Sequence, residues 1–163
     1  MKKFAAQAIL LLLVIIGAMF YYSPVSKNSK IEIPFLPHPL VVKSLEVNGS
    51  KLKVEIADTD SKRNKGLSGR DSLGIDEGML FVYSKPGAHP FWMKGMRFSL
   101  DFVWINNDKV VDIIPNVPPP SSGSKDVDLP IYSSKNEADK ILEVSAGTVQ
   151  RLNIKVGDTI SLK

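Results

Sequence analysis

The sequence predicts a mainly β domain, a compact antiparallel sandwich or barrel-like fold with one or two short helices, preceded by an N-terminal transmembrane helix. From residue 40 onward, short apolar runs alternate with turn residues, which is typical of strands. Long amphipathic helix patterns are missing from that region, which disfavours a doubly wound α/β fold. The 163 residues suffice for one domain with an appendage.

The appendage begins with an apolar run at residues 4–22, interrupted only by Gln7. At 1.5 Å per residue this run spans roughly 28 Å, about the thickness of a bilayer core. Lys2 and Lys3 supply the positive flank of a cytoplasmic end. The run ends in bulky residues where a signal peptidase requires small ones, which favours an uncleaved anchor at 1–22 over a cleaved signal peptide. Either interpretation puts the rest of the chain across the membrane from the cytoplasm, and the anchor makes the expected protein a single-pass protein of the cell membrane.

Residues 23–40 have the composition of an extended tether. They contain Pro24, Pro34, Pro37 and Pro39, which oppose regular helix and central strand. We therefore expect three parts, namely an anchor at 1–22, a Pro-rich tether at 23–40 and a β domain at 41–163.

Charge and cysteine content exclude several classes of function. The chain carries a net charge of +4, but residues 41–163 hold 17 Lys and Arg against 16 Asp and Glu. A nucleic-acid-binding domain carries its positive excess on the folded part, so we expect no nucleic-acid partner. Cysteine is absent, which excludes disulfides, thiol nucleophiles and Cys-based metal sites, and two histidines do not make a usual zinc site. No cofactor and no metal site are expected.

The first elements of the β domain are a hairpin and a short helix. Asn48-Gly49 joins strands expected at residues 40–47 and 51–57, and this dipeptide is the strongest short hairpin signal. Residues 61–65 are expected to form a helix of one or two turns, with capping residues before it and Gly66 after it.

The remaining elements follow from similar patterns. Asn106-Asn107-Asp108 is a turn between two strands, and the Pro-, Ser- and Gly-rich segment 115–130 is an exposed loop. Further strands are expected at residues 78–83, 91–93, 100–105, 109–114, 140–146 and 159–162, with a short helix at 148–152.

A series of short motifs in this domain resembles the family known as domain of unknown function 192. The resemblance covers residues 54 to 160, with the pieces in the family's order and spacing. The matching pieces are residues 54–59, 65–67, 78–82, 91–94, 100–101, 110–111, 142–144, 146–147 and 157–158, together with Arg70 and Leu73. The resemblance implies a mainly β domain of around a hundred residues, often exported or membrane-tethered, and implies no activity.

The chain departs from the family pattern at two places. Gly95-Met96 follows Phe-Trp-Met-Lys, where the family commonly has Asn-Thr. The loop after Val117 also has a longer insert, at residues 121–130. If that loop borders a binding site, the family's ligand does not transfer unchanged.

Charged side chains inside the apolar motifs are the candidate site residues. Asp101 and Glu143 lie within strands, so each needs a partner, and Lys94 is the expected partner of Asp101. In one interpretation these residues and Arg70 form ion pairs that fix strand register. In a second, Arg70, Trp92, Lys94, Asp101 and Glu143 form a ligand-binding patch at a cleft, with Trp92 as a stacking wall. In a third, Asp101 and Glu143 act as a catalytic carboxylate pair.

The function expected from these observations is non-covalent binding. We expect a membrane-tethered, extracytoplasmic β domain that binds a small polar or carbohydrate-like ligand, or an envelope protein, without catalysis. The alternatives are a carboxylate-dependent hydrolase acting in the envelope and a purely structural interaction module.

Overall fold

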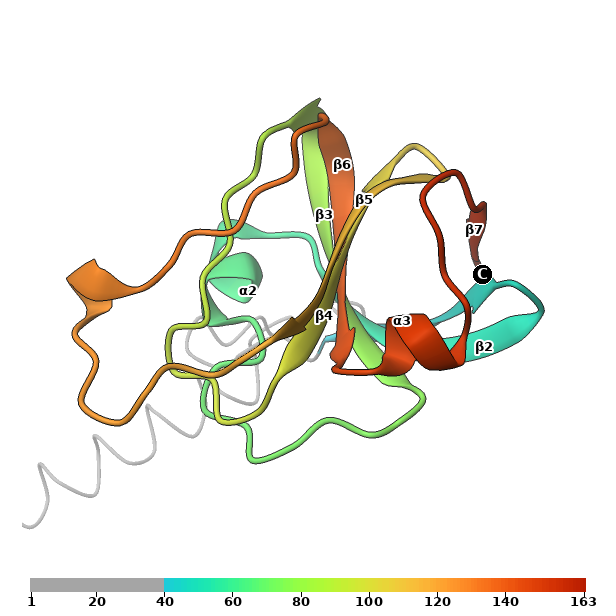
Figure 1. Cartoon of the computed structure of the whole chain (residues 1–163). Coiled ribbons are helices and arrows are strands. Elements are labelled where there is room, and N and C mark those ends of the chain that lie inside the picture. The colour runs from blue at the N-terminus through green and yellow to red at the C-terminus, as the bar shows by residue number, and fades with distance from the viewer. Residues whose placement is uncertain (1–39) are drawn as a thin grey trace, which may run out of the picture. The chain divides into compact units, whose positions relative to one another are not determined.

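One curled sheet dominates residues 40–163, which are the residues that the computed structural model describes (Figure 1). The strands follow the spatial order β5-β4-β6-β3-β2-β1-β7. Their bounds are β1 Val41–Val47, β2 Ser50–Ala57, β3 Glu77–Gly87, β4 Leu100–Asn106, β5 Lys109–Val117, β6 Ala138–Ser145 and β7 Ile160–Leu162. Two short helices, α2 (Asp60–Lys65) and α3 (Thr148–Arg151), and a 3₁₀ turn, η1 (Asp126–Asp128), complete the fold. The prediction of a mainly β domain with two short helices is confirmed.

The sheet curls into a half-barrel, in keeping with the barrel-like alternative of the prediction, but it is mixed and not purely antiparallel. Strands β2 and β3 run parallel, because the chain passes through α2 and a loop before re-entering the sheet, and the other neighbouring pairs are antiparallel. The two edge strands meet at one end. The amide of Val110 donates to the carbonyl of Asp158 (2.9 Å), and the amide of Ile160 donates to the carbonyl of Asp108 (2.8 Å).

The hairpin between β1 and β2 forms as predicted. Asn48 and Gly49 both adopt positive φ, 49° and 77°, and Val47 pairs with Ser50 across the turn. Two-residue turns with this backbone match the twist of the flanking strands. The helix predicted at residues 61–65 is α2, whose first turn is capped by the hydroxyl of Thr59.

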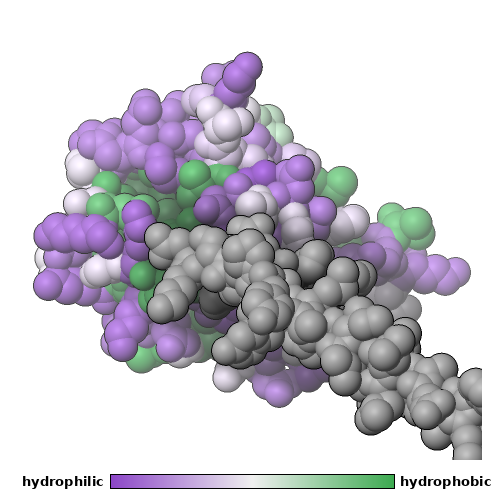
Figure 2. All heavy atoms as spheres, turned by 180° about the vertical axis from the view of Figure 1, so that it is seen from behind, coloured by the Kyte–Doolittle hydropathy of each residue, from purple (hydrophilic) through white to green (hydrophobic). Residues whose placement is uncertain are grey.

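The concave side of the sheet holds the first of two hydrophobic clusters. Hydrophilic side chains cover much of the described surface seen from behind, with hydrophobic ones between them (Figure 2).

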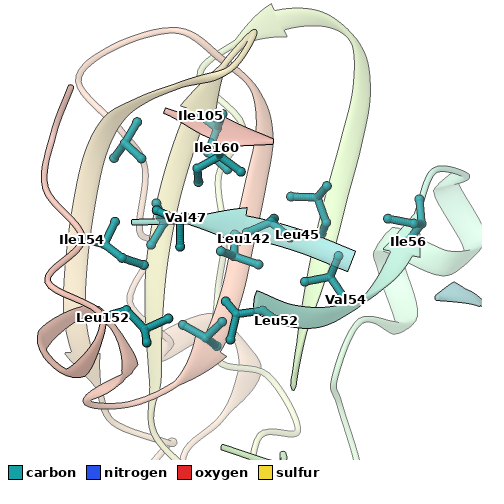
Figure 3. Close-up of a cluster of buried hydrophobic side chains, with 14 residues drawn as sticks. Leu45, Val47, Leu52, Val54, Ile56, Ile105, Leu142, Leu152, Ile154 and Ile160 are labelled. Carbon is teal, nitrogen blue, oxygen red and sulfur yellow. The ribbon is translucent and has the colours of Figure 1, made fainter. Parts of the chain in front are cut away.

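In the interior, all seven strands contribute buried residues to the first cluster, and Leu152 and Ile154 after α3 close the space (Figure 3). The cluster consists of Leu45, Val47, Leu52, Val54, Ile56, Leu80, Val103, Ile105, Val110, Leu142, Val144, Leu152, Ile154 and Ile160.

The second cluster lies on the other face of β3, β4 and β6. Phe81, Phe102, Trp104 and Ile141 are at its centre, and loop residues including Phe91 pack over them. In Figure 1 this face carries α2 and the loops before β4 and β6, whereas α3 and β7 lie on the opposite side. The central strands are therefore buried on both faces, which explains their continuous apolar runs.

Three predicted elements differ from the structure, the first being β3, which continues to Gly87 instead of ending at residue 83. The strand expected at residues 91–93 is reduced to one bridge, between Phe91 and Tyr132, because its partner segment is itself a loop. Strand β5 extends through Pro115 to Val117, so the loop begins later than predicted. A proline is accommodated there because β5 is an edge strand.

The predicted anchor at 1–22 and all but the last residue of the tether at 23–40 lie outside the described residues. Within residues 40–163, no helix combines the length and apolar character that crossing a bilayer requires.

Candidate functional site

A cleft opens on the loop-covered face of the sheet and encloses about 580 Å³. One wall comes from α2 and the turn after it, residues 63–68, and the opposite wall from loop residues 90–96 together with Ile131. Strand β3 contributes Phe81 and Tyr83, and β6 contributes Glu143. The cleft therefore joins segments that lie far apart in the sequence.

Glu143 is the buried ionisable group of this cleft. It sits in β6, in register with Met79 of β3 and Phe102 of β4, and retains only 5% of its exposure. Within residues 40–163, no side chain or backbone group forms a hydrogen bond or an ion pair with its carboxyl group. Burial raises the pKa of Glu143 to about 8, because removal from water penalises the carboxylate. At neutral pH most molecules hold a protonated, uncharged Glu143.

Aromatic side chains form much of the wall around this carboxyl group. Phe81 and Phe91 meet edge to face with their ring centres 4.9 Å apart. The Tyr83 ring lies 4.8 Å below the Arg63 guanidinium, and partial burial raises the pKa of its hydroxyl. Trp92 is 51% exposed, which is unusual for the largest side chain and leaves its ring available to a ligand.

Positive side chains surround the mouth, but two of them already have partners. The Arg63 guanidinium donates to the Val82 carbonyl (2.7 Å) and to Asp60 (2.6 Å). Lys94 pairs with Asp126 of η1 (2.6 Å), and its ammonium lies 5.4 Å from the centre of the Trp92 ring. The Lys94–Asp126 pair links the loop before β4 to the loop before β6, which together form one wall of the cleft.

Backbone conformation brings the two loop walls into contact. Gly95 adopts φ +68°, and its carbonyl accepts a hydrogen bond from the amide of Gly69 (2.9 Å). A Cβ atom at Gly95 would lie 2.2 Å from the Ser68 hydroxyl oxygen. The departure from the family pattern at Gly95-Met96 thus falls where the loops meet, and Met96 lines the cleft.

Three of the five predicted site residues meet in this cleft, namely Trp92, Lys94 and Glu143. Arg70 lies outside its lining. The Arg70 guanidinium makes a bidentate contact with Glu55 of β2 (2.8 and 2.6 Å), which holds the loop after α2 against the sheet. Arg70 thus forms an ion pair, as in the first interpretation, and lies apart from the three candidate ligand-binding residues that line the cleft.

Asp101 has a different environment from the predicted one. It is fully buried on the face opposite Glu143, in register with Val144. Its two carboxylate oxygens accept hydrogen bonds from the amides of Asn116 in β5 and Val149 in α3, both at 2.8 Å. The predicted Lys94–Asp101 pair is therefore wrong.

The predicted carboxylate pair of Asp101 and Glu143 is also wrong. Side chains alternate between the faces of a strand, and Asp101 is in register with the residue that follows Glu143. The two carboxyl groups consequently point to opposite sides of the sheet and do not share a substrate.

Sequence reasoning missed Arg63 and Tyr83. Tyr83 follows Phe81 at strand spacing, so alternation was a signal for its side of the sheet. Arg63 is brought over Tyr83 by the parallel connection between β2 and β3, for which the sequence has no local signal. Within the described residues, no three His, Asp or Glu side chains gather as a metal ion would require.

Comparison with known proteins assigns a family and a fold. The model of the DUF192 family, described as "Uncharacterized ACR", matches residues 43–162. A crystal structure of a proposed transcription regulator from Sinorhizobium meliloti is 28% identical, with 78% of this chain and 98% of that chain covered and a TM-score of 0.69. A protein of unknown function from Novosphingobium aromaticivorans is 28% identical, with 77% and 91% covered and a TM-score of 0.64. No curated protein matches the chain.

Proposed function

The chain belongs to the DUF192 family, which is described only as uncharacterised, and we propose a function for it from the chemistry of its cleft. The β domain binds a small polar, carbohydrate-like ligand between α2 and the loop before β4, without catalysing a reaction. Its place in the cell is the outer side of the membrane, to which residues 1–22 attach it.

The observation that carries this proposal is the burial of Glu143 beside open space. Removal from most of the surrounding water disfavours the charged form of a carboxyl group, and a hydrogen-bonding partner offsets part of that cost. Glu143 is 5% exposed, has no such partner among the described residues and lines a cleft of about 580 Å³. A ligand that hydrogen-bonds to this carboxyl group would remove the cost, so the cleft favours an occupant with polar groups.

The walls favour an occupant that also has a flat apolar surface. Trp92 is half exposed at the mouth, and Phe81, Phe91 and Tyr83 line the interior. Pockets that combine apolar walls with a few convergent polar groups are typical binding sites for small molecules. A sugar ring has one apolar face and several hydroxyl groups, which suits this combination.

Binding is better supported than hydrolysis. Glycosidases require two carboxyl groups on either side of the scissile bond. Among the described residues that line the cleft, Glu143 alone carries a carboxyl group. A single acid positions and hydrogen-bonds a ligand but does not complete that catalytic pair.

The regulator description of the Sinorhizobium meliloti structure applies to that protein. In this chain, residues 41–163 hold 17 Lys and Arg against 16 Asp and Glu, which leaves little charge to neutralise phosphates. The proposal therefore includes no nucleic-acid partner. An envelope protein becomes the expected partner only if no small ligand binds in the experiment described next.

Tryptophan fluorescence provides a test, because the chain has two tryptophans in contrasting environments. Trp92 is half exposed at the cleft and Trp104 is fully buried. We expect titration with monosaccharides and short oligosaccharides to change the emission of the wild-type chain. Trp92→Phe should abolish the change and weaken binding measured by calorimetry, because the stacking surface shrinks.

Arg151→Ala is the matched control for this experiment. It removes a cationic side chain of α3 that is paired with Asp76, on the other side of the sheet and outside the lining of the cleft, so sugar binding should stay unchanged. No binding of any sugar, or equal loss in the Trp92 and Arg151 variants, would contradict the proposal and favour a structural module. Attachment is checked separately by membrane fractionation and by the mass of the purified N-terminus, and a mature start near residue 23 would exclude the anchor.

A further inference from the structure

We propose that the ligand of this cleft carries a protonated amine, as an amino sugar does, and that the amine forms an ion pair with Glu143. This inference rests on the proposed binding function and specifies the chemical class of its ligand. It concerns which group of the ligand reaches the floor of the cleft, next to β6.

Within the described domain, no positively charged side chain forms an ion pair with Glu143. Nearby positive charge would favour the carboxylate, yet desolvation is the cause that raises the pKa of Glu143 to about 8. Arg63 and Lys94 are held by Asp60 and Asp126. The floor of the cleft is thus an acid without a base, and a ligand amine supplies the missing partner.

The walls of the cleft are rich in aromatic side chains, which favours a ligand with a positive charge. Ammonium groups are attracted to the faces of aromatic rings, and recognition sites for organic cations are commonly lined by several such rings. The cleft contains Phe81, Phe91 and Trp92, whereas the Tyr83 ring in its lining is already stacked on His89 and contacted by the Arg63 guanidinium. These rings offer faces and edges against which an organic cation can pack.

Positive side chains at the mouth of the cleft act against the binding of a cation. Arg63, Lys65 and Lys94 repel an approaching cation, and Tyr83 is the remaining titratable residue in the lining. Two of the three positive charges are compensated by carboxylates at 2.6 Å, so their field is reduced. A charge-assisted hydrogen bond at the low-dielectric floor acts at shorter range and is stronger.

Three sugars with the same ring test the inference on the full-length chain, namely glucosamine, glucose and N-acetylglucosamine. Glucosamine offers an ammonium group, glucose a hydroxyl group and N-acetylglucosamine an uncharged amide at one position. We expect glucosamine to bind at least about tenfold more tightly than the other two at pH 7, measured by calorimetry.

The variant Glu143→Gln is the matched protein control, because glutamine keeps the shape of a protonated glutamate but takes no charge. The preference for glucosamine should disappear in this variant, so that glucosamine, glucose and N-acetylglucosamine bind with affinities within about threefold of one another. In the wild type, glucosamine binding at pH 7 should also release a proton from Glu143, seen as a dependence of the binding heat on buffer ionisation. Glucose binding should release none.

The outcomes separate this inference from the proposed function. Equal affinity for the three sugars, or a preference that persists in Glu143→Gln, overturns the inference and leaves sugar binding intact. Absence of binding by all three overturns both. A glucosamine preference that depends on Glu143 and is accompanied by proton release supports both.

Discussion

At the scale of single residues, Glu143 makes stability depend on pH in a direction opposite to most carboxylates. Its pKa is about 8 in the folded protein and near 4.5 when the chain is unfolded. Between these values the folded state holds a proton that the unfolded state lacks, so the free energy of unfolding falls as pH rises from about 4.5 to 8. The total effect is on the order of 5 kcal/mol.

Glu143→Gln removes this proton linkage and provides the first prediction. The variant and the wild type should have similar stability at pH 5, whereas at pH 8 to 9 the variant should be more stable by several kcal/mol. Urea unfolding at pH 5, 7 and 9 measures the difference, in which the other titrating groups cancel. A constant difference across this range would mean that Glu143 is already ionised in the folded chain.

Asp101 is a structural carboxylate, and a second prediction follows from its two bonds. Asp101→Asn retains one oxygen acceptor and places an NH₂ group against an amide donor, so one bond is lost and a buried donor remains. We expect a loss of about 2–3 kcal/mol in the free energy of unfolding, measured by urea denaturation.

Lys94→Ala is the control for Asp101, because Lys94 was the partner expected from the sequence. Its observed pair with Asp126 is solvent-exposed, with side-chain exposures of 47% and 59%. The change should therefore be within about 1 kcal/mol. A large loss in Lys94→Ala that is not additive with Asp101→Asn would restore the original pairing.

At the scale of elements, local signals predicted those segments whose partners are adjacent in the chain. Asn48-Gly49 specified its hairpin, and the turn at Asn107, with φ 54°, joined β4 to β5 as expected. Phe91 gave a misleading signal. It packs into the second cluster from a loop and makes a single bridge instead of pairing along a strand. Strand pairing at long range, which decided that case, leaves no pattern in a single segment.

The contact between the two loops of the cleft gives a third prediction. Gly95→Ala strains the backbone at φ +68° and brings a Cβ atom 2.2 Å from the Ser68 oxygen. Gly123→Ala is the matched control, since Gly123 has φ +83° but open space around a Cβ atom. Backbone strain should cost both variants about 1–2 kcal/mol. Gly95→Ala should lose about 1 kcal/mol more from the clash, measured by urea unfolding.

Ser68→Ala in the Gly95→Ala background identifies the source of that extra loss. Removing the hydroxyl group should return the double variant to the level of Gly123→Ala. If the double variant stays as unstable as Gly95→Ala alone, the clash with Ser68 is not the cause.

At the scale of the whole molecule, the register and order of the paired strands determined which predicted site residues meet. The sequence placed Trp92, Lys94 and Glu143 among the candidates because each interrupts or borders an apolar run. Strand alternation by itself also separates Asp101 from Glu143 once the register of β4 and β6 is known. That register, and the parallel pairing that brings Arg63 to the cleft, depend on contacts across the chain, which no short motif encodes.

Closure of the half-barrel depends on a side chain in the first hairpin, and this gives the last prediction. The Asn48 amide donates to the carbonyls of Leu152 (3.3 Å) and Asn153 (3.0 Å) and to the Asp158 carboxylate (2.8 Å). These bonds tie the β1–β2 turn to the segment between α3 and β7. Because β7 has only three residues, we expect the bonds to hold this segment in place.

Asn48→Gly preserves the turn, because glycine adopts positive φ freely, but removes all three bonds. Asn107→Gly is its matched control, since Asn107 occupies an equivalent turn with φ 54° and uses only backbone atoms in its hydrogen bonds. Both variants gain the same freedom in the unfolded chain, so the difference between them isolates the side-chain bonds. Asn48→Gly should be less stable than Asn107→Gly by about 1–2 kcal/mol in urea unfolding. Hydrogen exchange should also accelerate at the amide of Ile160, which bonds across the closure, and equal exchange in both variants would show that closure is maintained by the strands alone.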